Sequence, residues 1–109
     1  MRGTWACSVA VIASLSSCDC FRRINAVVLE EGTAHPVGDV EVRERNANGS
    51  YEEQRLLTTA NGTFEFSDVS GGFRCPDVQL HFAKPGYLPL DRTFPSTTSG
   101  DTIYLKRLP

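Results

Sequence analysis

The side chains that could do chemistry in this chain are few and scattered. The two histidines, His35 and His81, could serve as general bases or metal ligands, and four cysteines could serve as nucleophiles or metal ligands. A zinc hydrolase needs ligands at a short fixed spacing such as HxxE, and neither histidine has a glutamate three residues later. Cys20, His35, Cys75 and His81 show no close metal-ligand spacing, so we expect no metal site and no cofactor.

The other polar candidates also lack a catalytic arrangement. Asp68 and Asp77 could form a pair of carboxylates, but acidic residues at turns usually cap backbone amides or face solvent. The chain contains neither a GxSxG nucleophile elbow nor a glycine-rich phosphate loop. His35, His81, Asp68, Asp77 and Arg92 stand singly, so we expect no catalytic residue and no enzymatic activity.

The N-terminal region has the composition of a targeting segment. Arg2 supplies a positive start, and residues 5–15 form an uncharged, mostly apolar run that includes Trp5, the only tryptophan. A membrane-spanning helix needs about 17 to 25 apolar residues, which is more than this run provides. We therefore predict that residues 1–17 are a signal peptide that is removed.

A four-residue motif follows this run directly. Leu15, Ser16, Ser17 and Cys18 resemble the lipobox of bacterial lipoproteins, which is leucine, two small residues and cysteine. The resemblance implies that the Cys18 sulfur receives a diacylglyceryl group, that the bond before Cys18 is cleaved, and that the new amine is acylated, for example with palmitate. It also implies a lipidated tether over residues 18–23 and a place in the bacterial cell envelope, on the periplasmic or surface side. The alternative is ordinary secretory cleavage near Ser17, with Cys18 as a plain thiol.

Cys20 and Cys75 remain as a pair once the other two cysteines are accounted for. In an oxidising compartment, the natural use of such a pair is a disulfide, here closing a loop of about 56 residues. Two free thiols, or pairing of Cys20 with another chain, are the alternatives.

Length and charge limit the remaining classes of function. The 109 residues leave room for one domain, which we place at residues 24–109. Eleven lysines and arginines against 13 aspartates and glutamates give a net charge of -2, so nucleic acid is not an expected partner. Hydrophobic residues at 40% are typical of a globular chain.

Short strands separated by turn signals fill this domain. Asn48-Gly49 and Asn61-Gly62 are favoured hairpin pairs, and Pro89 places the sixth strand at a sheet edge. The pattern predicts an all-β fold, a seven-stranded antiparallel β-sandwich. The expected strands are 24–30, 37–44, 51–59, 63–66, 78–83, 88–94 and 102–106. The side chains expected to face inward are Val40, Val42, Phe64, Phe66, Val78, Leu80 and Phe82.

Three segments in order, 32–42 (GTAHPVGDVEV), 58–69 (TTANGTFEFSDV) and 83–90 (AKPGYLPL), resemble the carboxypeptidase regulatory-like domain. The resemblance implies a seven-stranded sandwich of the prealbumin (transthyretin) type. Ala26 stands where this family often has glycine, and Thr59 where it often has aspartate. The family is a scaffold found beside metallocarboxypeptidases, in outer-membrane receptors and in surface proteins, so it implies architecture far more than activity.

These observations favour a lipid-anchored, non-catalytic envelope module that binds or assembles with an unidentified envelope protein through loops at one end of the sandwich. The alternative from another class is a carbohydrate-binding module, in which Tyr51 or Tyr87 offers a stacking face for a glycan. Loss of Trp5 with the signal peptide weakens that alternative. A purely structural spacer is a third hypothesis.

Overall fold

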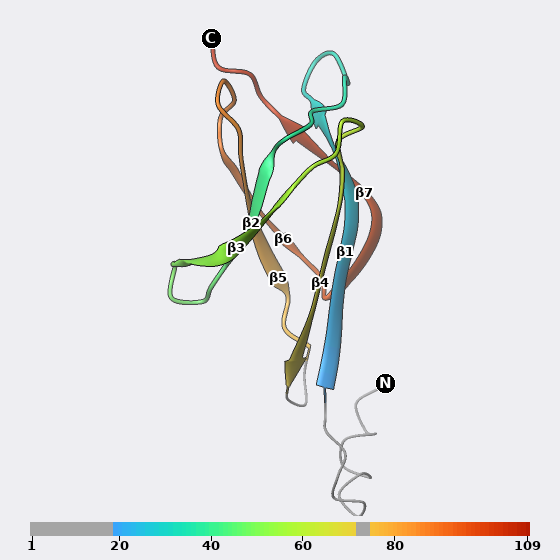
Figure 1. Cartoon of the computed structure of the whole chain (residues 1–109), viewed down its shortest axis with the longest axis vertical. Coiled ribbons are helices and arrows are strands. Elements are labelled where there is room, and N and C mark those ends of the chain that lie inside the picture. The colour runs from blue at the N-terminus through green and yellow to red at the C-terminus, as the bar shows by residue number, and fades with distance from the viewer. Residues whose placement is uncertain (1–18, 72–74) are drawn as a thin grey trace, which may run out of the picture.

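Residues 19–71 and 75–109 are described by a computed structural model, and they form two β-sheets packed face to face (Figure 1). One sheet has the order β4-β1-β7 and the other has the order β3-β2-β5-β6. The predicted signal peptide and Cys18 lie outside the described residues. The strands are β1 (Asp19–Glu30), β2 (Glu41–Arg45), β3 (Tyr51–Leu57), β4 (Thr63–Gly71), β5 (Val78–Ala83), β6 (Leu90–Phe94) and β7 (Thr97–Leu105).

The predicted seven-stranded sandwich is confirmed, except that one of its strand pairs is parallel and not antiparallel. Neighbouring strands are antiparallel except β1 and β7, which run parallel, with a register shift between Asn25 and Ala26. β7 begins at Thr97 rather than at residue 102, because its Ser- and Thr-rich start also pairs with β1. The chain passes from β6 to β7 between the two sheets, which is how the first and last strands come to lie side by side.

The core lies between the sheets and is apolar. Phe82, Leu80, Val78, Val42 and Val40 are all at most 1% exposed. The prediction from strand alternation is confirmed for every inward residue except Phe66, which is only partly buried against the core. Further buried side chains come from β1, β6 and β7, namely Ile24, Val28, Phe94, Ile103 and Leu105.

Backbone geometry and a buried side chain fix the turns at one end of the sandwich, including the predicted Asn61-Gly62 turn. Gly62 has φ +80°, and a Cβ at this position would collide with the carbonyl oxygen of Val28, so only glycine fits there. The buried Thr58 hydroxyl donates to the Val37 carbonyl at 2.8 Å and accepts from the Val40 amide at 2.9 Å. The loops at this end of the sandwich are thereby held in place. No helix long and apolar enough to cross a bilayer occurs in the described part of the chain.

β1 begins earlier than the predicted strand, which started at residue 24. Residues 19–23, assigned from the sequence to a tether, extend β1 and pair with the end of β4. Two inward side chains in this extension hold it to the sandwich: Cys20 is in a disulfide and Arg22 is in an ion pair. The described part of β1 therefore includes most of the predicted tether.

Candidate functional site

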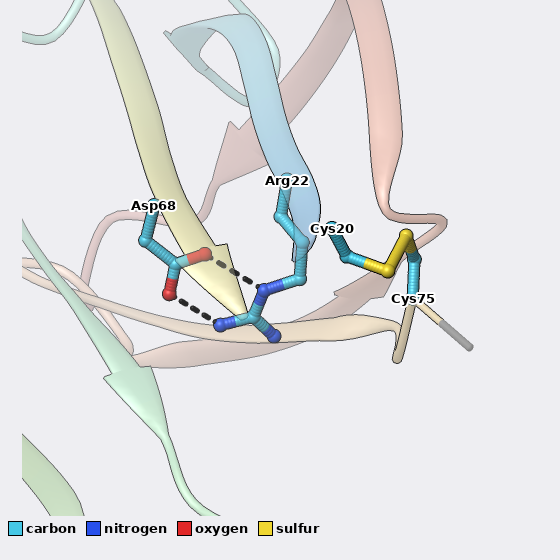
Figure 2. The surroundings of a disulfide bond; sticks show 4 residues. All are labelled: Cys20, Arg22, Asp68 and Cys75. Atoms are coloured by element: carbon cyan, nitrogen blue, oxygen red, sulfur yellow. Dashed lines mark hydrogen bonds and ion pairs between the residues drawn. A yellow bond between two sulfur atoms is a disulfide. The ribbon is translucent and has the colours of Figure 1, made fainter. Parts of the chain in front are cut away.

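A layer of charged side chains replaces apolar ones at the disulfide end of the core. Arg22 on β1 reaches its cross-strand neighbour Asp68 on β4, as Figure 2 shows, and its Nε lies 2.8 Å from the Asp68 Oδ1. The same guanidinium crosses to the other sheet, where it donates to Glu44 on β2 at 2.9 Å. The three residues continue the inward-facing rows of their strands, so this ionic layer joins the two sheets where the apolar core ends.

The electrostatics of this layer favour the charged state of the Arg22 guanidinium. The hydrogen bonds that Arg22 donates to Asp68, more than the one it donates to Glu44, raise the pKa of the Arg22 guanidinium above its ordinary value despite its burial. The Arg22 side chain is only 8% exposed, whereas that of Asp68 is 34% exposed. One cation facing two carboxylates leaves the layer with an excess negative charge.

A groove opens above the ionic layer, between the edge strands of the two sheets. It has a volume of about 550 Å³ and is lined by the apolar Val42, Leu56 and Phe66 and by the ionic layer. Glu52, Gln54 and Arg55 on β3 form its rim. Within the described residues, β3 pairs only with β2 and β4 only with β1, so each presents an unpaired strand edge to this side of the molecule. In Figure 1 the β2–β3 hairpin projects away from β4.

Replacing Arg22 by methionine is expected to destabilise the fold by about 2–3 kcal/mol, because Asp68 and Glu44 would face each other without a cation. The value lies below that of a fully buried ion pair, since Asp68 retains contact with solvent. Urea unfolding followed by circular dichroism measures the loss.

The matched control removes all three charges together, as Arg22→Met, Glu44→Leu and Asp68→Leu. This variant should recover most of the lost stability, because no uncompensated charge remains. A single Arg22→Met variant as stable as the wild type would contradict the assignment of Arg22 as the cation holding this layer.

A second group of polar side chains lies on the outward face of the four-stranded sheet. The His81 Nδ1 lies 2.6 Å from the Asp91 Oδ1, and the Tyr51 ring packs on the imidazole with centroids 4.7 Å apart. Arg45 approaches Asp91 to only 3.9 Å, and the Nε atoms of Arg45 and Arg43 are buried without a hydrogen-bond partner. The group thus combines an exposed aromatic ring with loosely held cations.

A third group closes the opposite end of the sandwich. Glu30 at the end of β1 accepts hydrogen bonds from the Tyr87 hydroxyl at 2.8 Å and from Arg107 at 2.9 Å. The Arg107 guanidinium also lies over the Tyr87 ring, 5.3 Å from its centroid. These contacts lower the pKa of Glu30, mainly through Tyr87 and then Arg107, and raise that of Tyr87, mainly through Glu30. Tyr87, one of two tyrosines predicted to bind a ligand, is here half-buried and bonded within the fold.

The lowered pKa of Glu30 predicts an acid-sensitive contribution to stability. A carboxylate whose pKa is depressed on folding stabilises the fold at pH values above its ordinary pKa of 4.5. This contribution is lost as the pH falls through the lower pKa of the folded state. Glu30→Gln should therefore be less stable than the wild type at neutral pH, with the difference shrinking in strong acid. The urea unfolding midpoints of both proteins, measured at neutral pH and in strong acid, give this difference. A difference independent of pH would show that Glu30 acts by packing alone.

The residues singled out as catalytic candidates are not assembled into one site. Asp68 belongs to the ionic layer, His81 pairs with Asp91, and Arg92 lies 3.3 Å from Asp101. His35 and Asp77 are exposed at separate places in the chain. No side-chain hydrogen bond within the described residues joins any two of the five, and no group of three potential metal ligands was found there.

The predicted disulfide is present in the structure. Cys20 on β1 is bonded to Cys75, just before β5, with Cα atoms 5.3 Å apart, which is an ordinary separation for a bridge (Figure 2). Cys20 is 7% exposed. The bond ties the first residues of β1 to the connection that leads into the other sheet, next to the Arg22–Asp68 pair.

Comparisons with known proteins were made by sequence and by structure. No family model matches the chain, and no curated protein matches it. Among solved structures, 3-chlorocatechol 1,2-dioxygenase from Rhodococcus opacus aligns with a TM-score of 0.60 and 12% identity, over 86% of this chain and 62% of that one. The backbone protein of pilus 2b from group B streptococcus aligns with a TM-score of 0.55 and 15% identity, over 79% and 41%. A minor pilin of Streptococcus agalactiae aligns with a TM-score of 0.52 and 20% identity, over 82% and 45%.

This likeness shows the fold alone. An enzyme and two pilins share the sandwich with this chain at identities of 20% or less, so the same architecture occurs in proteins with different functions. The chain spans less than two thirds of the length of each of these structures. The resemblance to the carboxypeptidase regulatory-like domain is supported as far as the β-sandwich and no further.

Proposed function

We propose that this chain is a lipid-anchored, non-catalytic module of the bacterial cell envelope that binds a protein partner in the groove between β3 and β4. The observation that carries the binding role is the groove itself, where two unpaired strand edges flank an apolar and acidic cleft. Two of the structures with this fold are pilin proteins, which fits a role in surface assembly. The lipobox-like motif ending at Cys18 supports the anchor.

The anchor and the groove fit one geometry. Cys18 immediately precedes β1, and the disulfide holds the first residues of that strand to the sandwich. A lipid on Cys18 would therefore keep the disulfide end next to the membrane, with almost no flexible tether between them. The loops at the opposite end, where Glu30 and Arg107 meet, would point away from it.

The chemistry of the groove defines the partner it suits. An exposed strand edge accepts an extended segment of another chain through main-chain hydrogen bonds, with alternate side chains entering the cleft. Leu56 and Phe66 would contact an apolar side chain. The three carboxylates of Glu44, Glu52 and Asp68 outnumber the two cations, Arg22 and Arg55, and this excess would favour a lysine or arginine. The proposed partner is therefore an extended, basic segment of an envelope protein.

Site-specific photocrosslinking tests the binding role. A photoreactive residue at Gln54, exposed on the edge strand β3, should crosslink to a partner in intact cells. Thr93, exposed on the opposite edge strand β6, is the matched control and should give no such product. The charge-reversing substitution Glu52→Lys should remove the Gln54 product. Equal products from both edges, or a Gln54 product insensitive to Glu52→Lys, would contradict the groove as the site.

Metabolic labelling tests the anchor independently. The wild type should incorporate labelled fatty acid and partition into detergent, whereas Cys18→Ser should accumulate as an unlabelled precursor. Cys20→Ser is the matched control and should keep the label, because the resemblance assigns lipid to Cys18 alone. A wild-type protein that is soluble in the medium and unlabelled would refute the anchor.

Carbohydrate binding is a second candidate, favoured by the Tyr51 group. Tyr51 is 40% exposed beside His81, and the loosely held Arg43 and Arg45 could receive an acidic sugar. Tyr51→Ala should abolish retention on acidic glycans, while Tyr104→Ala, an exposed tyrosine on the other sheet, should not. Absence of retention by the wild type on a glycan array would discard this candidate.

A further inference from the structure

Two apolar side chains are exposed as a pair at the disulfide end of the three-stranded sheet. Phe21 on β1 and Val69 on β4 are direct cross-strand neighbours, and they are 74% and 54% exposed. Both belong to the outward rows of their strands, whose next members are the polar Arg23 and Ser67. A buried phenylalanine would stabilise the fold, so an apolar pair left this open at the end of the sheet indicates a surface meant for another apolar phase.

The position of this pair relative to Cys18 identifies that phase. Phe21 is three residues beyond Cys18, which places the two within about 10 Å of each other along the chain. The pairing of β1 with β4 and the disulfide hold Phe21 itself in a fixed place on the sandwich. A shallow groove of about 460 Å³ lies beside the pair, lined also by Arg23 and Thr97.

We propose that Phe21 and Val69 insert into the surface of the bilayer beside the acyl chains on Cys18, so that the sandwich stands on its disulfide end. This inference rests on the proposed lipid anchor. An aromatic ring is well suited to the boundary between acyl chains and headgroups. Arg23 is 62% exposed and paired with Glu65 one step further along the strands, where its long side chain can reach the headgroups.

This placement gives the anchor a function beyond attachment. A lipid on a flexible tether would leave the sandwich free to tumble, whereas an additional contact by the folded part fixes its axis relative to the membrane. The ionic layer and the lower part of the β3–β4 groove would then lie just above the headgroups, with the opposite loops projecting outward. A partner segment reaching the groove would approach along the membrane surface.

Tryptophan fluorescence tests the contact, because removal of residues 1–17 takes away the only tryptophan. Full-length Phe21→Trp is expressed in a bacterium, and the processed protein is reconstituted into phosphatidylethanolamine and phosphatidylglycerol vesicles with brominated acyl chains. We expect the emission of the tryptophan at position 21 to shift to shorter wavelength and to be quenched by bromine.

The matched control is Tyr104→Trp. Tyr104 is 51% exposed, and its partner in β7–β1 pairing is Leu29, eight residues along β1 from Phe21 and therefore roughly 25 Å away. Its emission should be neither shifted nor quenched. A second variant, Val69→Ser in the Phe21→Trp background, should reduce the quenching while the protein stays bound to vesicles.

Detergent partitioning is measured first, because it separates a failure of the lipid anchor from a failure of the proposed contact by Phe21 and Val69. A protein that floats with vesicles but shows no quenching at position 21 would overturn this contact and leave the lipid anchor standing. Equal quenching at positions 21 and 104 would also overturn it, because the sandwich would then lie flat. A protein that is not lipid-bound at all would overturn the anchor and this contact together.

Discussion

Phe82→Ala is expected to destabilise the sandwich by about 3–5 kcal/mol, which is comparable to the whole stability of many small domains. The Phe82 ring is completely buried and packs edge-to-face against Phe64 and Phe94, with centroids 5.6 and 6.4 Å away. Removing it leaves a cavity at the junction of both sheets. Urea unfolding followed by circular dichroism should show a much lower midpoint or no folded baseline.

The matched control for this substitution is Phe21→Ala. The same side chain is removed, but from a position that is 74% exposed and makes no part of the core. Its effect on stability in water should stay within about 0.5 kcal/mol. Equal losses for the two variants would contradict the placement of the core between the sheets.

Replacing both Cys20 and Cys75 by serine is expected to cost about 4 kcal/mol, nearly as much as losing the Phe82 ring. The bond closes a long loop, with a sequence separation of 55, and so restricts the unfolded chain strongly. Cys20 is also buried, and a serine there would place a hydroxyl among apolar neighbours. The free energy of unfolding of the oxidised wild type and of the double variant measures the difference.

Reduction of the wild type by dithiothreitol provides the control, because it breaks the bond without changing either side chain. The reduced protein should lose most of the same stability, and both thiols should resist alkylation until the reductant is added. Rapid alkylation of the native, unreduced protein would discard the bridge.

Much of the fold could be predicted from period-two alternation and turn chemistry. Val40 and Val42, or Val78, Leu80 and Phe82, repeat at the spacing of a strand with one buried face, and the Asn-Gly pairs mark where the chain turns. Pro89 correctly indicated that the following strand, β6, lies at a sheet edge. These are local signals, and local signals are what a single sequence carries.

The ionic layer was missed for a reason that its residues make clear. Asp68 was interpreted as a solvated turn residue, while Arg22 and Glu44 were given no role. Arg22 stands two residues before buried Ile24, and Asp68 stands two residues after Phe66, so alternation already placed both side chains inward. Recognising their partnership required knowing that β1 pairs with β4, a contact between residues far apart in the chain.

The parallel pairing of β1 with β7 depends on the tertiary fold in the same way. A Ser- and Thr-rich segment has no hydrophobic period, so the sequence predicts the last strand only from residue 102. Pairing with β1 satisfies the backbone of this segment, and the register shift coincides with Gly100, which has φ +76°. The geometry of neighbouring strands thus decides a conformation that composition alone leaves open.

The proposal that this sandwich is a lipid-anchored envelope module is tested most directly by intact-mass spectrometry of the protein purified from membranes. We predict a chain that begins at Cys18, carries the mass of a diacylglyceryl group and an N-acyl chain, and lacks two hydrogens because Cys20 and Cys75 are joined. Treatment with a reductant should restore the two hydrogens and leave the lipid in place. A chain that begins at another residue, or that begins at Cys18 without added lipid, would contradict the account.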